Sequence, residues 1–224
     1  MGANHFYAFL FGRCLCRPRA ALLALSVSLS GFLVVHSPQT AAAAAPQPDP
    51  VSRRWQLNIK PGPLRLAIMP VEGVGSRAFF YFTYTVKNNS GKDLLFAPSF
   101  ELATDDGSLR RAGVNVPAAV TKALLKRLRN PFLRDQIGAV GLLLQGEENA
   151  REGLVVWPAD NLEVDHVTIF AVGFSGETKT ITRPDTGKPV LLRKTLMLVH
   201  DTPGDLAYNG DHPLTRSEQR WIMR

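Results

Sequence analysis

Residues 79–86 read FFYFTYTV, and two sets of side chains alternate along this stretch. Successive side chains of a β-strand point to opposite faces of a sheet, so one set is expected to share a face. That set is Phe80, Phe82, Tyr84 and Val86. Aromatic and β-branched residues are also enriched in strands, and the NNSG stretch at 88–91 favours a turn. We predict a strand with one buried face and one open face.

Similar alternation predicts further strands on both sides of this stretch. They cover residues 55–59, 64–69, 94–102 with an interruption at Pro98, 108–111, 153–157, 167–174, 177–182, 190–200 and 220–223. Turns are predicted at the PGP triplet 61–63 and at the polar residues 146–149, and the DDG triplet 105–107 predicts a two-residue hairpin turn. The apolar residues 142–144 are too few to show a period.

Residues 117–129 are the one stretch with a convincing helical period. Its apolar positions recur every four residues, at Val120, Leu124 and Leu128. A proline opens the stretch, where its missing N–H loses no hydrogen bond, and the Asn-Pro pair at 130–131 ends it. Strands divided by turns, without alternating helices, indicate an all-β protein. We predict a two-sheet antiparallel Ig-like sandwich with one short helical insertion at about residues 117–130.

The N-terminal residues have the pattern of an export signal. Arg13, Arg17 and Arg19 precede an apolar run at 20–35, an alanine tract follows at 41–45, and no acidic residue occurs in this part. We predict that residues 1–45 are a signal peptide or, if uncleaved, an N-terminal membrane anchor. Residues 46–54 are expected to be a Pro/Ala-rich tether, and residues 55–224 the β-sandwich domain. The domain is then periplasmic or extracellular, or anchored to the inner membrane.

Composition limits the function of the exported part. The only two cysteines, Cys14 and Cys16, lie in the predicted leader, so no disulfide is expected in the mature chain. The formal net charge is +7, but 23 basic and 19 acidic residues remain once the leader is removed. These charges are interspersed, without the clustered basic and aromatic face of a nucleic-acid binder. Nucleic acid is therefore not an expected partner.

The segment 173–177, GFSGE, resembles the nucleophile elbow of serine hydrolases up to its last position, which is Glu177 in place of glycine. An elbow also requires a helix after the serine, whereas a strand is predicted here. Asp185 and His200 would complete a triad in the usual order, but no pattern brings them to Ser175. A hairpin turn is favoured, and a serine hydrolase centred on Ser175 stays as an alternative.

The remaining motif-like patterns fit loops better than binding sites. Residues 73–78, GVGSRA, match a loose dinucleotide fingerprint, yet a strand is predicted where that motif requires a helix. Three acids between residues 160 and 165 are fewer oxygen ligands than calcium takes. The histidines of the mature chain are dispersed without an HExxH pattern: His166, His200 and His212. We predict no catalytic, cofactor-binding or metal-binding residues, and no cofactor.

Basic residues concentrate on and near the predicted helix. They are Arg110, Arg111, Lys122, Lys126, Arg127 and Arg129. Such a cluster attracts acidic polymers or lipid surfaces at long range, although basic outer faces are also common on helices of soluble domains. These six residues are the candidate contact with a polyanion.

Several segments in combination resemble an uncharacterised family of exported proteins of planctomycete-type bacteria. They are YFTYTVKNNSGKDLLFAPSFEL at 81–102, LLLQGEENARE at 142–152, VVWPAD at 155–160, VGFSGE at 172–177 and the closing RWIMR. The resemblance covers residues 55–224 and implies a single extracytoplasmic β-rich domain with a short helical insertion. It implies no activity and no catalytic residues.

These observations favour an exported, non-catalytic binding or structural module of the cell envelope, with an unknown envelope protein or polymer as partner. Two alternatives stay open. One is the serine hydrolase centred on Ser175, and the other is electrostatic binding of an acidic envelope polymer or lipid.

Overall fold

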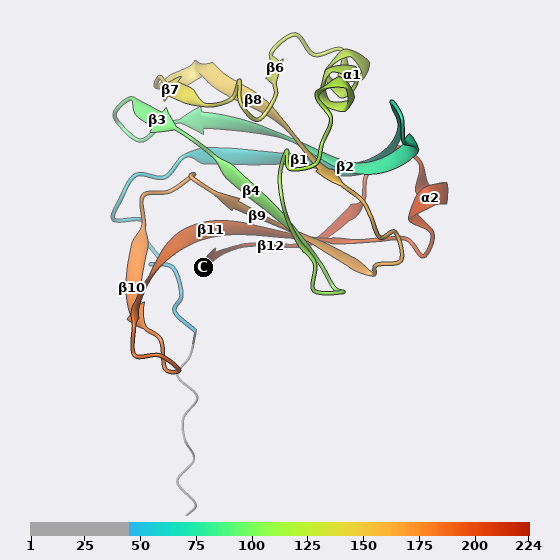
Figure 1. Cartoon of the computed structure of the whole chain (residues 1–224). Coiled ribbons are helices and arrows are strands. Elements are labelled where there is room, and N and C mark those ends of the chain that lie inside the picture. Colours follow the sequence, from blue (N-terminus) through green and yellow to red (C-terminus); the bar gives the residue numbers. More distant parts are fainter. Residues whose placement is uncertain (1–44) are drawn as a thin grey trace, which may run out of the picture. The chain divides into compact units, whose positions relative to one another are not determined.

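Two β-sheets stack face to face in residues 45–224, which are the residues that the computed structural model describes (Figure 1). Sheet one has the strand order β1-β2-β8-β6, formed by Asn58–Val71, Gly75–Asn88, Gly146–Pro158 and Leu133–Arg134. The predicted leader, apart from Ala45, lies outside the described residues. Strands dominate the described chain, so the all-β prediction is confirmed.

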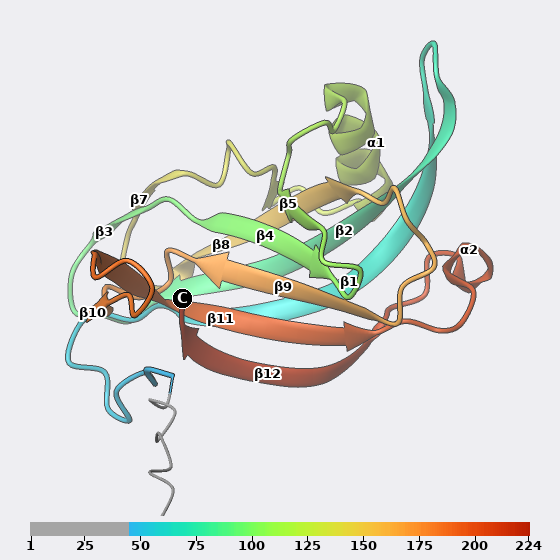
Figure 2. The same cartoon turned by 60° about the horizontal axis from the view of Figure 1, so that its bottom comes forward.

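Sheet two contains six strands, of which five lie side by side in the order β5-β4-β9-β11-β12 (Figure 2). They are Leu109–Arg111, Ser99–Thr104, His166–Val172, Pro189–Asp201 and Thr215–Met223. The sixth strand, β10 (Thr178–Thr182), pairs with the first residues of β11. A third, two-stranded sheet joins β3 (Leu94–Phe96) to β7 (Gly141–Leu143). The prediction of two purely antiparallel sheets is therefore incomplete, and β6 also runs parallel to β8.

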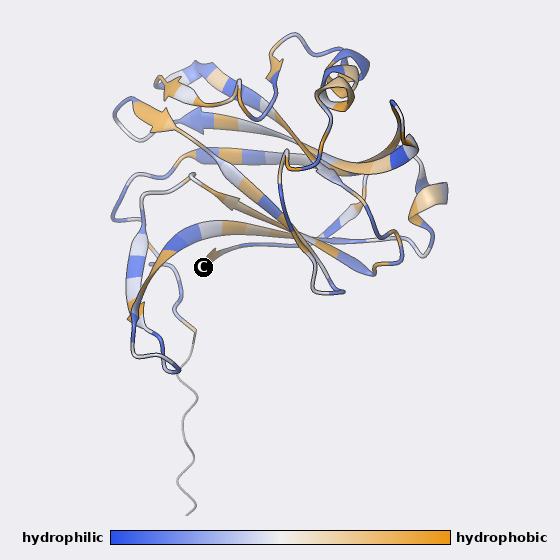
Figure 3. Ribbon diagram, viewed as in Figure 1, coloured by the Kyte–Doolittle hydropathy of each residue, from blue (hydrophilic) through white to orange (hydrophobic). Residues whose placement is uncertain are grey.

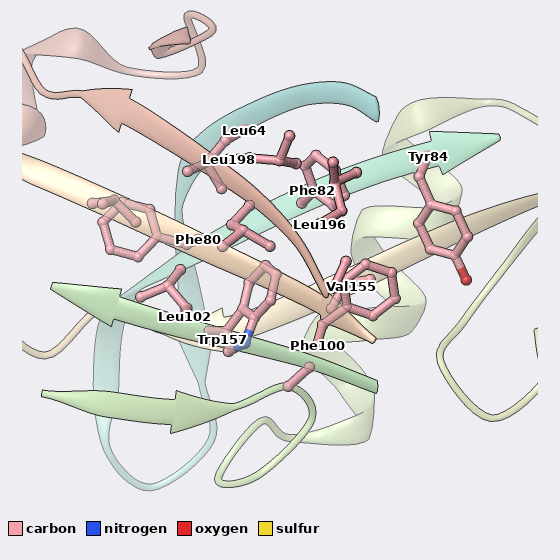
Figure 4. Packing of buried hydrophobic residues seen from close by; sticks show 14 of the residues in the cluster. Leu64, Phe80, Phe82, Tyr84, Phe100, Leu102, Val155, Trp157, Leu196 and Leu198 are labelled. Atoms are coloured by element: carbon pink, nitrogen blue, oxygen red, sulfur yellow. The ribbon is translucent and has the colours of Figure 1, made fainter. Parts of the chain in front are cut away.

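The main hydrophobic core fills the space between the two sheets (Figure 4). Sheet one contributes the predicted face of β2, with Phe80, Phe82, Tyr84 and Val86, together with Leu64, Val155 and Trp157. Sheet two contributes Phe100, Leu102, Ile169, Leu196 and Leu198. The alternation of residues 79–86 thus predicted correctly which side chains are buried together.

The opposite face of sheet one is not open, contrary to the prediction for residues 79–86. Helix α1 (Ala118–Leu128) covers it, and its residues Val120 and Leu124 form a second core cluster with Phe79 and Tyr81. The helix lies where it was predicted, with Pro117 as N-cap and Arg129 as a left-handed C-cap. A second helix of four residues, α2 (Leu206–Asn209), was not predicted. Within residues 45–224, no helix has the length and apolarity needed to cross a membrane.

The predicted turn at residues 61–63 is wrong, because β1 runs through it as one strand with a register shift between Pro61 and Leu64. At Gly62 the backbone approaches β2 so closely that a Cβ would lie 2.4 Å from the Thr83 hydroxyl oxygen. Prolines are tolerated here because β1 is an edge strand, where missing N–H groups break no ladder. The triplet therefore makes a bulge in a strand.

Two other predicted turns differ in detail. The loop between β4 and β5 has three residues, since the Thr104 N–H bonds to the Ser108 carbonyl and Gly107 adopts a φ of 85°. This is the three-residue hairpin with a left-handed glycine rather than the two-residue form. Residues 146–149 belong to the start of β8, opposite the end of β2, where the register shifts. A bulge again replaces a turn.

The predicted tether makes specific contacts with sheet two. The Lys179 ammonium lies 2.8 Å from the Asp49 carboxylate, and the Asp49 N–H donates to Glu177 over 2.7 Å. Ser52 accepts a hydrogen bond from Lys194 over 3.2 Å. Residues 49–52 therefore pack along β10 and β11.

Candidate functional site

The six basic residues singled out in the sequence occupy two elements. Arg110 and Arg111 lie on β5 of sheet two, whereas the other four lie on α1 or at its C-cap. Three of the six are engaged in ion pairs: Arg110 with Asp160 at 2.9 Å, Arg111 with Glu101 at 3.8 Å, and Arg127 with Asp211 at 2.8 Å. Lys122, Lys126 and Arg129 are exposed and form no ion pair with any residue of 45–224. The structure therefore leaves three free cations on one helix.

The packing of α1 determines which side chains stay free. Val120 and Leu124 lie four residues apart on the face that contacts sheet one, so Lys122, Lys126 and Arg129 point away from it. Arg127 is held by Asp211, whose carboxylate also accepts a hydrogen bond from the Tyr81 hydroxyl. Burial of the Tyr81 hydroxyl is the main cause that raises its pKa to about 12, and its hydrogen bond to Asp211 adds to the effect. The hydroxyl therefore stays protonated and acts as a donor. Arg127 thus has a structural role.

An exposed apolar region adjoins this helix and was missed by the sequence reasoning. The chain between α1 and the end of β7 exposes Phe132 by 75%, Ile137 by 84% and Leu142 by 58%, with Val140 and Leu144 beside them. Leu95 of β3 is 75% exposed and lies directly opposite Leu142 in the β3–β7 ladder. Figure 3 shows β3 and β7 as mostly hydrophobic strands. Contiguous exposed apolar side chains mark interaction surfaces.

The basic and apolar side chains belong to one surface. Lys122 and Ile137 line one hollow between α1 and the following loop, together with Asp135. Phe132 and Leu142 line a second hollow, together with Arg134, Arg151 and one acid, Glu148. Figure 1 shows α1 over one face of sheet one, with β6, the edge strand of that sheet, and β7 near it. The α1–β7 surface, as we call it, consists of Leu95, Lys122, Lys126, Arg129, Phe132, Arg134, Ile137, Val140, Leu142 and Leu144.

Charge is distributed unevenly over the domain. Residues 107–146 contain seven basic residues and one acid, Asp135, whereas the rest of residues 45–224 contains 16 basic and 18 acidic residues. Asp135 accepts the N–H of Gly138 over 2.7 Å within its own turn. The positive excess of the domain therefore lies in the segment that forms most of the α1–β7 surface.

Hydrogen bonds from inside the domain hold this surface in shape. The Arg151 guanidinium donates to the carbonyls of Ala139 over 2.8 Å and Leu142 over 2.6 Å. Asn88 is fully buried, and its amide donates to the carbonyls of Leu143 and Lys92. These contacts fasten β7 to β2 and β8, so the exposed leucines are displayed by a supported strand.

The predicted hydrolase residues are not brought together. Ser175 accepts the N–H of Glu177 over 3.2 Å and donates to the carbonyl of Trp55 over 3.4 Å. His200 pairs with Val167 at the start of β9, whereas Ser175 follows the end of that strand. Asp185 binds Arg183 in another loop. Ser175 therefore has no base within the described chain.

The glycines around Ser175 have structural reasons. Gly173 adopts a φ of 96°, and a Cβ at Gly176 would lie 2.5 Å from the indole nitrogen of Trp55. Residues 173–176 thus form a bend that receives Trp55, rather than a nucleophile elbow.

The other motif-like patterns also occupy structural positions. Residues 72–74 form the β1–β2 turn, and Gly75 is already the first residue of β2. Asp160 binds Arg77 and Arg110, and His166 lies 3.1 Å from Asp201. Within residues 45–224, no three His, Cys, Asp or Glu side chains are grouped as metal ligands would be. The α1–β7 surface stands out as the candidate site.

Comparison of the chain with models of protein families, with curated proteins and with solved structures gives no match. The fold and the α1–β7 surface together define an all-β domain with an exposed face that is both basic and apolar.

Proposed function

We propose that the protein is an exported, non-catalytic binding module of the cell envelope that holds an acidic partner on its α1–β7 surface. The observation that carries this proposal is the set of three free cations on α1 beside exposed apolar residues. Opposite charge draws partners together and selects among them, while apolar contact supplies affinity.

An Ig-like classification is part of the proposal. The order β1-β2-β8-β6 corresponds to strands A-B-E-D of that fold, and β5-β4-β9-β11 corresponds to C′-C-F-G. The parallel direction of β6 departs from the usual D strand, and β12 adds one strand beyond G. Ig-like domains commonly serve as scaffolds for binding surfaces, which agrees with a non-catalytic role.

Export is proposed on the sequence of residues 1–45, whose arginines, apolar run and alanine tract are typical of a leader or anchor. The working location is then periplasmic or extracellular, or the outer side of the inner membrane. Membership of the uncharacterised planctomycete-type family of exported proteins is proposed on the segments quoted above.

Retention of the full chain on immobilised heparin, a soluble polyanion, tests the electrostatic part. The variant K122E/K126E/R129E is expected to elute at clearly lower salt than the wild type, because all three charges are free. The control R54E/K188E/R193E changes the net charge equally at exposed positions outside the surface. Equal shifts in the two variants would show that the protein responds to net charge alone, and the proposed site would be wrong.

A further inference from the structure

We propose that the acidic partner is an anionic phospholipid membrane, and that the loop and strand between residues 131 and 144 enter its headgroup region. This inference rests on the proposed function, since it names the partner of the same surface. A partner for this surface must offer more than negative charge, because the exposed apolar side chains also need an apolar environment to pack against.

Exposed apolar side chains distinguish a membrane from a soluble polyanion. Phe132, Ile137 and Leu142 are each more than half exposed, and Leu95 adds to them from β3. A hydrated polymer offers such side chains nothing to pack against. The boundary between headgroups and acyl chains buries apolar groups to a depth of about 5 to 10 Å.

The order of residues along the chain suits the layers of a bilayer surface. Lys126 and Arg129 lie at the end of α1, and Arg134 follows Phe132 by two residues, so cations border the apolar group. Long basic side chains keep their charged ends at the phosphates while their stems contact apolar material. Each basic residue near an anionic membrane contributes roughly 1 kcal/mol, or about fivefold in affinity.

The backbone of this segment already satisfies many of its polar groups. The N–H groups of Phe132 and Leu133 bond to Asn130, and the N–H of Val140 bonds to Ile137. The carbonyls of Leu142 and Leu143 accept hydrogen bonds from Arg151 and Asn88. Peptide groups with internal partners lose less when water is removed. The segment is therefore suited to a poorly hydrated environment.

A local fluorescent probe tests insertion in the full chain. With Cys14 and Cys16 replaced by serine, I137C is labelled with an environment-sensitive NBD dye and mixed with phosphatidylcholine vesicles with or without 25% phosphatidylglycerol, a composition chosen for the test. We expect a blue shift and a severalfold rise in emission only with the anionic vesicles. The control Y208C carries the dye on α2, at a side chain that is 91% exposed and lies outside the surface. Its emission should not change.

Variants separate insertion from charge. In the I137C background, F132S/L142S should lose most of the response, whereas I68S/L191S, which changes two other half-exposed apolar residues, should keep it. Thermal unfolding of each variant shows whether it is folded, and K122E/K126E/R129E, which leaves the apolar residues intact, should weaken vesicle binding roughly a hundredfold.

Each contrary outcome has a meaning. If heparin retention depends on the α1 cations but the dye at residue 137 does not respond, the partner is an acidic polymer and the membrane proposal is wrong. If the dyes at 137 and 208 respond equally, contact is not made through this surface, which also overturns it. If neither heparin nor vesicles bind, the proposed function falls as well.

Discussion

Lys194 and Glu177 form an ion pair inside the domain, with 2.9 Å between Nζ and Oε2 and only 5% and 6% of the two side chains exposed. Each partner also holds the N-terminal segment, since Glu177 accepts the N–H of Asp49 and Lys194 donates to Ser52. Burial acts to raise the pKa of Glu177, but Asp49 and Lys194 keep that pKa below its ordinary value. The pair thus fastens residues 49–52 onto sheet two.

Replacing one partner of this pair is expected to cost more than replacing both. The variant Glu177→Gln leaves the Lys194 ammonium buried without a counter-charge and should lower the free energy of unfolding by about 3 kcal/mol. The double variant Glu177→Gln/Lys194→Met removes both charges and should recover part of that loss. Urea unfolding of the single and double variants measures the coupling, and losses that simply add would contradict it.

Stability should fall between pH 6.5 and about 4 because of His200. His200 is buried, with only 1% of the residue exposed. Burial is the main cause that lowers the pKa of its imidazole from 6.5 to about 4, and the positive charge of Arg216 adds to the effect. In this window the unfolded chain binds a proton that the folded chain does not, so lowering the pH favours unfolding. The total loss is about 3 kcal/mol and is complete below pH 4.

The variant His200→Leu should remove this pH dependence above about pH 5.5, where the carboxylates of the unfolded chain do not yet take up protons and the lowered pKa values of Glu177 and Glu147 do not contribute. The control His212→Gln changes an exposed loop histidine and should keep the wild-type curve. Urea unfolding at half-unit pH steps gives both curves. A His200→Leu curve parallel to that of the wild type would assign the effect to other groups.

The alternation of residues 79–86 predicted the core face of β2, and the four-residue spacing from Val120 to Leu128 predicted α1. Both patterns are visible within a short stretch of sequence, and the side chains that they select are the ones that packing on sheet one buries. The PGP triplet at residues 61–63 predicted a turn because such triplets usually form one. In the structure it lies within β1, and Gly62 packs closely against Thr83 of the neighbouring strand. That close approach depends on a partner twenty-one residues away in the sequence.

Half of the candidate site could be read from the sequence. The cations of α1 were visible as a cluster, but their ion pairs were not, because Arg127 meets Asp211 only in the folded chain. The exposed pair of Leu95 and Leu142 depends on the pairing of β3 with β7, two three-residue strands too short to show a period. The sequence signal available for this apolar part of the site was the run VGLLL at 140–144, which contains no polar residue.

Gly62→Ala should destabilise the protein by about 1 to 3 kcal/mol. The added Cβ would lie 2.4 Å from the Thr83 hydroxyl and 2.7 Å from its carbonyl oxygen, so a side-chain rotation alone does not relieve the clash. Gly204→Ala is the matched control, because a Cβ there meets nothing within 4 Å. Thermal unfolding compares the two, and equal midpoints would show that the β1 bulge yields without cost.

Ser175 should not react with a fluorophosphonate probe, since no base lies beside its hydroxyl in the described chain. Its oxygen instead accepts the N–H of Glu177. Gel fluorescence of the purified full chain checks this, with a known serine hydrolase as positive control. Labelling that disappears in Ser175→Ala would contradict the non-catalytic proposal and support the hydrolase alternative.

Arg151→Met should loosen β7 without unfolding the domain. The substitution keeps the aliphatic stem but removes the donors to Ala139 and Leu142, whose carbonyls then depend on water. Hydrogen exchange of residues 139–144 should become faster by at least an order of magnitude, while the amides of β9 and β11 keep their wild-type rates.

The same variant links the support of β7 to binding. A loosened strand must be ordered again before Leu142 and Leu144 meet a membrane, so vesicle binding should weaken by more than the roughly fivefold that the loss of one charge beside this surface would give. Arg183→Met, which removes an exposed ion pair in a distant loop, is the matched control and should leave exchange and binding unchanged. If Arg151→Met speeds exchange yet binds vesicles as the wild type does, the surface does not need to be held in shape, and its free cations alone carry the contact.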